Sequence, residues 1–353
     1  MSNLTYEQIK SLTEWDERET RHFMPNEIFE DLQAEEEDEN GEKKPILNTS
    51  QHVAFAYSYY YLTSWLYRYT KYGTKHIDTK KIEQNGNKTI DYIIKNKGVY
   101  NIDVSMIKEL LGYTRTNKTI NYIIKNKGKL DSMGYTETTN NYPILWHLDE
   151  FIGEHKELVF TLVDELDIEM KDLIRESQGT NYKIKCPIKH FYRYEEDIDD
   201  GYLSGIFYDV SDTHEVGFDV FAHCMSIKEL GTNGFYLYGY LKMKNQHFKD
   251  GYDVSLKGLS KATGIPYKSM TRYLDALREY NLVKGIHNQE YFSQGINGED
   301  RKANTYITNN SDQFKFKPQP YQKMEVKTFD EHLEVKAKKK SEKVDITLSE
   351  LPY

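Results

Sequence analysis

The sequence predicts an α+β protein, mainly helical, in which two winged helix-turn-helix domains are joined by an acidic α/β linker region. Three observations support this prediction. Residues 253–287 follow the order helix, tight turn, helix, strand, and residues 103–148 show much of the same order earlier in the chain. Between them, residues 151–221 contain seventeen Asp or Glu against seven Lys or Arg. An acidic segment therefore separates the two predicted domains.

A chain of 353 residues is long enough for two or three domains, each with its own core. We divide it into an N-terminal arm with an acidic loop (1–50), a first winged-helix domain (51–150), an acidic linker region (151–228), a second winged-helix domain (229–310) and a disordered basic tail (311–353). The tail is assigned as disordered because it combines prolines at 318 and 320 with a group of lysines and shows no apolar period.

Composition narrows the class of protein. No run approaches the roughly 18 apolar residues that a membrane span needs, and the first ten residues lack the basic and then apolar order of a signal peptide. Two cysteines, Cys186 and Cys224, give no disulfide framework. We therefore expect a cytoplasmic protein that does not associate with membranes.

The distribution of charge matters more than the net charge of −9, which argues against a protein that coats nucleic acid indiscriminately. Residues 65–130 hold fourteen Lys or Arg against five Asp or Glu, and residues 241–302 hold eleven against seven. Two basic segments on either side of an acidic one are expected where two lobes meet phosphates.

The first 72 residues contain an acidic run and a predicted helix. The acidic run at 35–41 is expected to be a solvated loop, because it offers no apolar residue to a core. Residues 52–72 are rich in tyrosine and apolar residues at helical spacing. They predict a buried first helix of the first winged-helix domain.

An internal repeat follows. NKTIDYIIKNKG at 87–98 and NKTINYIIKNKG at 117–128 differ only by Asp91 against Asn121. The isoleucines at i, i+3 and i+4 predict a helix that ends at the final glycine in each copy. The second copy follows a predicted short helix and a turn at Gly112, so we assign it as a recognition helix. Its candidate DNA-contacting residues are Arg115, Thr116, Lys118, Asn121 and Lys125. The wing strands would be 129–135 and 142–148.

The second predicted recognition helix begins after Pro266, which is favourable at the first position of a helix. Its apolar stripe packs on the preceding helix, and the opposite face would enter the major groove. The candidate DNA-contacting residues of this domain are Lys268, Ser269, Thr271 and Arg272 in the helix, and Arg301 and Lys302 in the loop between two wing strands. Arg272 suits guanine and Asn121 suits adenine, each contributing about 1–3 kcal/mol of discrimination.

The acidic middle gives no clear site. Residues 158–173 are predicted to be helical. The carboxylates at 195–200 are expected to lie in a solvated loop. The candidate zinc ligands Cys186, His190, His223 and Cys224 do not follow the spacing of a zinc finger. We expect neither a metal nor a cofactor.

Catalytic motifs are missing from the sequence. Residues 112–119 resemble a phosphate-binding loop, but Asn117 stands where the second glycine is required. The sequence has no His-x-His pair, His-Glu-x-x-His, Gly-x-Ser-x-Gly or Cys-x-x-Cys motif. We therefore expect a protein that is not an enzyme.

Two features resemble the replication initiators of plasmids and related mobile elements of low-GC Gram-positive bacteria. One is the segment MPNEIF at 24–29 ahead of a tyrosine-rich helix, and the other is the pair of winged-helix units ending at Leu148 and Thr308. The resemblance covers about half of the chain, and the duplicated segment departs from it. It implies a protein that binds repeated origin sites in double-stranded DNA and recruits host replication proteins.

Two other functions remain open. The first is a transcriptional regulator of a phage or mobile element. The second is an adaptor whose winged helices bind protein, which the net charge of −9 and the acidic middle favour. The acidic middle is also a candidate surface for a homodimer.

Overall fold

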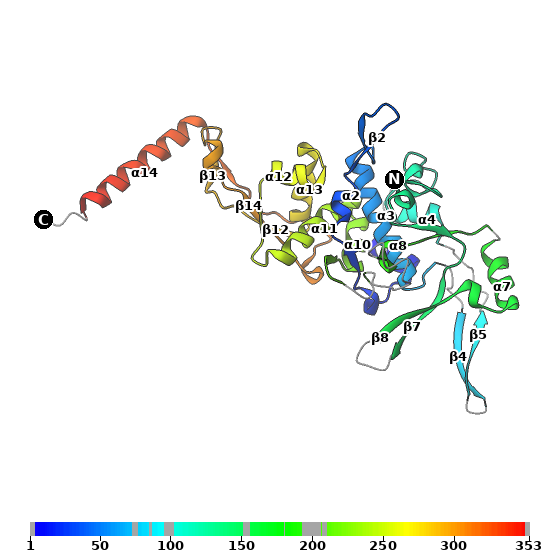
Figure 1. Cartoon of the computed structure of the whole chain (residues 1–353). Helices are drawn as coiled ribbons and strands as arrows, with labels where there is room; N and C mark the ends of the chain where they lie inside the picture. Colours follow the sequence, from blue (N-terminus) through cyan, green and yellow to red (C-terminus); the bar gives the residue numbers. More distant parts are fainter. Residues whose placement is uncertain are drawn as a thin grey trace. The chain divides into compact units, whose positions relative to one another are not determined.

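The computed structural model describes residues 4–72, 77–84, 87–94, 102–150, 156–179, 181–192, 206 and 210–349 (Figure 1). The chain divides into two compact units, Met1–Met243 and Lys244–Tyr353. Both units combine helices with antiparallel strands, so the predicted α+β class is confirmed. None of the helices within the described ranges has the length and apolarity needed to cross a bilayer.

Helix α3 (Ser50–Arg68) is the core of the first unit (Figure 1). It begins where the side chain of Thr49 accepts a hydrogen bond from the backbone N–H of His52. Every residue from 53 to 67 is buried, as the sequence predicted for this segment. A helix that is buried on all sides needs other elements around its whole circumference.

The elements around α3 come from both ends of the first unit. Strand β1 (Phe23–Pro25) pairs antiparallel with β10 (Thr213–Glu215), although they are far apart in sequence. Helices α10 (Phe218–Ser226) and α11 (Gly231–His247) supply aromatic rings, and Phe218 stacks on Trp65 of α3 with 3.8 Å between ring centroids. The aromatic rings that these helices supply are thus part of the core of the first unit.

The other helices and helical turns of the first unit are short. They are α1 (Tyr6–Thr13), η1 (Glu17–Glu19), α2 (Ile28–Asp31), α4 (Val104–Leu110), α5 (Asn121–Ile124), α6 (Lys129–Ser132), η2 (Val163–Glu165), α7 (Ile168–Gln178) and α8 (Ile188–Phe191). The acidic run expected as a loop instead forms an exposed hairpin of β2 (Glu35–Glu37) and β3 (Lys43–Pro45).

The two copies of the repeat fold differently. The first copy forms β5 (Asn87–Ile94), which pairs with β4 (Ile77–Gln84), so the helix predicted for it is wrong. In the second copy the α-helix is limited to α5 (Asn121–Ile124). Both sequences are rich in isoleucine, threonine and tyrosine, which favour a strand when a partner strand is present. The pairing with β4 therefore overrides the helical spacing.

Of the wing predicted for the first domain, the strand at 142–148 is confirmed as part of β7 (Pro143–Glu150), whereas the strand at 129–135 and the pairing of the two are wrong. Residues 129–132 form α6, and β7 pairs with β8 (Lys156–Leu162). Strand β6 (Glu137–Thr139) pairs with β9 (Ile184–Cys186). The helix predicted at 158–173 is replaced in its first part by β8, where valine, phenylalanine and threonine favour a strand.

The second unit has the element order predicted from its sequence. Strand β11 (Tyr252–Val254), helices α12 (Leu256–Thr263) and α13 (Tyr267–Glu279), and strands β12 (Val283–Ile286) and β14 (Asn304–Thr308) follow one another. The three strands form an antiparallel sheet in the order β11, β14, β12. Between β12 and β14 lie β13 (Tyr291–Phe292) and η3 (Gly298–Asp300).

The expectation of a disordered tail is wrong for residues 311–349. They contain η4 (Ser311–Gln313), β15 (Glu325–Val326) and α14 (Phe329–Ser349), and β15 pairs parallel with β13. At the start of α14, Thr328 Oγ1 accepts from the Glu331 N–H at 3.3 Å while Glu331 Oε2 accepts from the Thr328 N–H at 2.7 Å. This reciprocal capping box is a helix start signal that the proline and lysine content obscured.

Candidate nucleic-acid interface

The turn between α12 and α13 is fixed by backbone geometry and one side chain. Gly264 ends α12 in the left-handed conformation, with φ of 68°. Pro266 follows as the N-cap of α13. The hydroxyl of Ser260 donates to the backbone oxygen of Ile265 at 2.6 Å, and Ile265 itself is buried. The angle between the two helices is therefore held from within the turn.

One side of α13 is buried and the other is exposed. Met270, Leu274 and Leu277 are each 2% exposed or less. Lys268 and Arg272 are exposed on the same helix, while Ser269 and Thr271 are half-buried. The helix is thus anchored by its apolar side and presents cationic side chains near its N-terminal end.

Arg272 is held in a defined orientation. Its guanidinium carbon lies 4.6 Å from the centroid of the Tyr273 ring, and one of its nitrogens donates to the Tyr273 hydroxyl at 2.7 Å. A guanidinium group has five N–H donors, so that of Arg272 keeps donors for a further partner. The ring beneath it reduces the number of orientations that the side chain samples.

The C-terminal half of α13 is engaged by the tail. The Tyr321 hydroxyl donates to Asp275 Oδ1 at 2.6 Å, and the guanidinium of Arg278 lies 4.1 Å from the Tyr321 ring centroid. The backbone N–H of Gln319 donates to the oxygen of Glu279 at 2.7 Å. The N-terminal half of α13, with Lys268 and Arg272, is therefore the part of the helix that these contacts leave accessible.

The loop before β14 has mixed charge. Arg301 and Lys302 are exposed there, directly after Glu299 and Asp300. The Arg301 guanidinium lies 5.5 Å from the Phe292 ring centroid and donates to the backbone oxygen of Ile296 at 3.2 Å. Both predicted basic residues thus lie in the loop between β12 and β14, beside two acidic residues.

No family model, curated protein or solved structure matches this chain.

In the first unit, the five predicted residues do not share one helix. Arg115 precedes α5 and forms an ion pair with Glu109 at 2.6 Å. Thr116 and Lys118 are exposed in the same connection, and Lys125 is the C-cap of α5. Asn121 alone lies within α5, and its side-chain oxygen accepts a hydrogen bond from Lys108 Nζ at 2.6 Å. Asn121 is therefore already engaged inside the unit.

The segment MPNEIF is part of the core of the first unit. Met24 and Ile28 are fully buried, and the Phe29 ring lies 5.4 Å from that of Tyr57 on α3. The apolar residues of the segment are therefore explained by their packing around α3.

The candidate metal ligands are not brought together. Among the residues that the structure describes, no group of three or more His, Cys, Asp or Glu side chains is arranged to hold a metal ion. Cys224 is buried, which raises the pKa of its thiol. His190 is buried as well, and its Nδ1 and Nε2 are in hydrogen-bond contact with the Tyr60 hydroxyl and the Phe23 backbone oxygen.

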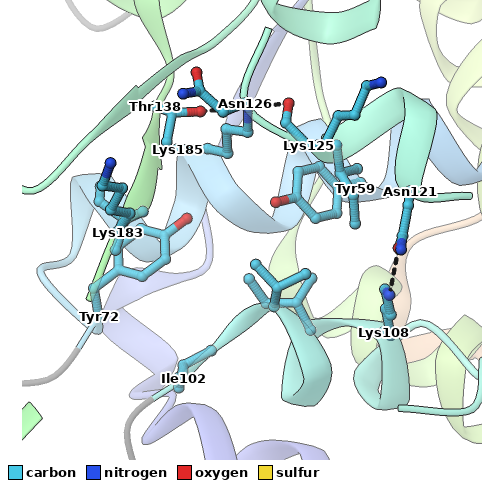
Figure 2. A pocket seen from close by; sticks show the side chains of 14 residues that line it. Tyr59, Tyr72, Ile102, Lys108, Asn121, Lys125, Asn126, Thr138, Lys183 and Lys185 are labelled. Atoms are coloured by element: carbon cyan, nitrogen blue, oxygen red, sulfur yellow. Dashed lines mark hydrogen bonds between the residues drawn. The ribbon is translucent and has the colours of Figure 1, made fainter. Parts of the chain in front are cut away.

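The first unit also contains a cavity that was not predicted from the sequence (Figure 2). It has a volume of about 410 Å³ and is lined by residues of α3, α4, α5, β6 and β9. Lys183, Ile184 and Lys185 all line it, and no local sequence pattern indicated this. The rest of the lining comes from segments that only the fold brings together.

Proposed function

We propose that this chain is a sequence-specific double-stranded DNA-binding protein whose second unit is a winged helix. The observation that carries the proposal is the asymmetry of α13: Met270 and Leu274 are buried, while Lys268 and Arg272 are exposed near the N-terminal end. A recognition helix contacts base edges with the side chains near its N-terminus while its apolar side is fixed to the domain.

The two cations have different roles in this proposal. Arg272 would read a guanine, because its planar fork matches the O6 and N7 acceptors in the major groove. Lys268 would contact a phosphate and contribute affinity without sequence preference. Ser269 and Thr271 are shorter and half-buried, so they are the weaker candidates on this helix.

The first unit would add contacts to the DNA backbone. Thr116 and Lys118 are exposed and suit phosphate oxygens. Arg115 and Asn121 would first have to leave Glu109 and Lys108, so we assign them lesser roles. The tandem arrangement is proposed in this reduced form, with a single base-reading helix in the second unit.

The biological setting that we propose is initiation of replication at the origin of a plasmid or mobile element, in the cytoplasm, with host replication proteins as partners and a second copy of the chain on repeated sites. This setting is supported by the resemblance of residues 24–29 and of the helix-turn-helix order to such initiators. Regulation of transcription is the alternative on the same DNA-binding surface.

The test is a selection of duplexes from a random library with the full chain at about 150 mM salt, where weak electrostatic association is suppressed. We expect one enriched motif. Arg272→Ala should then lose about 1–3 kcal/mol of discrimination at one base pair. Lys268→Ala should weaken binding to all duplexes and lower the salt slope by about 1.

Lys336→Ala is the matched control, because Lys336 is an exposed lysine on α14. Its binding should equal that of the unchanged chain. Failure to enrich any motif, or equal discrimination by Arg272→Ala and Lys336→Ala, would contradict the proposal. If no motif is enriched, the protein-binding adaptor is favoured, which is consistent with the net charge of −9.

A second experiment separates replication from transcription. A plasmid that carries the selected site should be maintained in cells only when the chain is present and Arg272 is unchanged. A promoter effect without plasmid maintenance would identify the chain as a regulator.

A further inference from the structure

The cavity of the first unit has the size of a small-molecule site. Its volume is about 410 Å³, within the range of roughly 300–1,000 Å³ that is usual for such sites. It is formed where α3 meets α4, α5 and β9, four elements that are themselves held by the core of the unit. The cavity is therefore a property of the fold of the first unit, and two of its lining residues, Asn121 and Lys125, are also candidate DNA contacts.

One part of the lining is aromatic and apolar. Tyr59 and Tyr72 are each 1% exposed, and Ile107, Ile124 and Ile184 are buried beside them. The Tyr72 hydroxyl donates to the backbone oxygen of Thr63 at 3.3 Å, which fixes that ring. Figure 2 shows the ring of Tyr59 turned into the cavity. These surfaces suit a flat ring, which can pack against aromatic and aliphatic side chains at once.

The other part of the lining is positively charged. Lys108, Lys125, Lys183 and Lys185 all line the cavity, and none of the Asp or Glu residues in the described part of the chain does. Lys185 is neutralised by Asp131, which lies outside the lining, at 2.6 Å. The other three lysines form no ion pair with the residues that the structure describes. The cavity therefore has an excess of positive charge that a ligand can balance.

Lys108 is the unusual member of this group. Its residue is 6% exposed, and its Nζ donates to the backbone oxygen of Asn117 at 2.7 Å and to Asn121 Oδ1 at 2.6 Å. Both acceptors are neutral, and an ammonium group has three donors. One N–H thus remains for an oxygen of a ligand. Burial lowers the pKa of Lys108, which is the direction expected for a cation without a countercharge.

We propose that this cavity binds a small anion with a flat ring, of the nucleoside monophosphate class. The ring would pack against Tyr59 and the isoleucines, and the phosphate would contact the exposed lysines Lys125 and Lys183. Lys108 would donate its third N–H to an oxygen of the base or sugar. A phosphate balances more of the three lysine charges than a carboxylate does, because it carries up to two negative charges near neutral pH.

The test is calorimetric titration of the full chain with the nucleoside monophosphates AMP, GMP, CMP and UMP. Inorganic phosphate, which represents the phosphate group alone, and benzoate, which represents a flat ring with a carboxylate, are titrated for comparison. We expect at least one nucleotide to bind more tightly than either part. Lys183→Ala should weaken that binding at least about tenfold, because it removes a charge-assisted contact at the exposed side of the site. The same nucleotide should raise the melting temperature of the unchanged chain.

Lys43→Ala is the matched control, since Lys43 is an exposed lysine of β3 in the same unit and does not line the cavity. It should bind the nucleotide as the unchanged chain does. Tryptophan fluorescence verifies that each variant is folded, because Trp15, Trp65 and Trp146 all lie in the first unit. The proposal is overturned if no nucleotide binds at millimolar concentration, if benzoate binds as tightly, or if a folded Lys183→Ala binds unchanged.

Discussion

Lys108 on α4 donates a hydrogen bond from Nζ to the side-chain oxygen of Asn121 on α5, at 2.6 Å. A second hydrogen bond runs to the backbone oxygen of Asn117 at 2.7 Å. These two oxygens replace water around an ammonium group whose residue is 6% exposed. The Lys108–Asn121 hydrogen bond therefore joins the two short helices α4 and α5.

Asn121→Ala should lower the free energy of unfolding of the first unit by about 1–3 kcal/mol, because it leaves a buried N–H of a cation unsatisfied. Urea unfolding followed by tryptophan fluorescence measures this change, since the three tryptophans lie in the first unit. Asn126→Ala is the control, because Asn126 is an exposed neighbour on the same segment. In the Lys108→Met background, Asn121→Ala should cost less; an equal cost in both backgrounds would show that the pair is not coupled.

Three histidines are buried beside α3. His214 Nε2 is 2.8 Å from the Tyr57 hydroxyl, and His22 Nε2 is 2.7 Å from Ser64 Oγ. The ring of His190 stacks on that of His22, with 5.0 Å between centroids. Burial holds the pKa of His22 and His190 well below 6.5 and lowers that of His214 from 6.5 to about 3. All three rings are thus neutral in the folded unit near neutral pH.

The first unit should lose stability as the pH falls below 6.5. Unfolded histidines take up protons near that pH while the buried ones do not, so the unfolded state binds more protons. Above pH 6.5 these histidines should not make the free energy of unfolding depend on pH. Below pH 6.5 the free energy of unfolding should fall by at most about 1.4 kcal/mol per pH unit for each histidine. Urea unfolding at pH 7.5, 6.5 and 5.5, followed by tryptophan fluorescence, gives the slope.

His214→Asn provides the comparison for this slope. Asparagine keeps hydrogen-bonding groups near Tyr57 and Asn26 but does not titrate. Between pH 6.5 and 5.5 the slope should therefore be shallower than in the unchanged chain. An identical slope would show that His214 does not contribute, whatever the effect of the substitution on the stability at pH 7.5.

The turn of the second unit depends on Gly264. Its φ of 68° lies in the left-handed region, which a side chain with a Cβ disfavours. Gly264→Ala should destabilise the pair of helices by about 1 kcal/mol. Hydrogen exchange of residues 256–279 in the full chain measures the effect. Gly264→Asn should lose less, because asparagine tolerates this conformation; equal losses would show that the backbone conformation is not the cause.

The sequence predicted the second unit well and the first unit poorly, for a physical reason. In the second unit, Pro266, Gly264 and the stripe that includes Leu274 act between neighbours in the sequence, so α12 and α13 could be predicted. In the first unit the decisive partners are remote. Strand β1 pairs with β10, and β6 with β9. No local pattern indicates such pairings.

The repeat shows the same limit within one unit. Residues 87–94 form a strand because β4 precedes them, whereas their near-copy at 117–124 follows α4 and forms turns and the short helix α5. The candidate site on α13 could be read from helical spacing alone. The cavity could not, because Lys108 and Lys183 are brought together only by the fold.

The tail should stabilise the loop between β12 and β14. Strand β15 pairs with β13, and His332 of α14 contacts the Tyr291 hydroxyl through Nδ1 at 3.0 Å. Deletion of residues 325–353 should therefore increase hydrogen exchange in residues 289–296 and leave that of α12 unchanged, because the backbone groups of β13 lose their partners. Deletion of residues 341–353 alone keeps Lys339 beside Glu290 and should have little effect. Equal protection of residues 289–296 in both shortened chains would contradict this role of the tail.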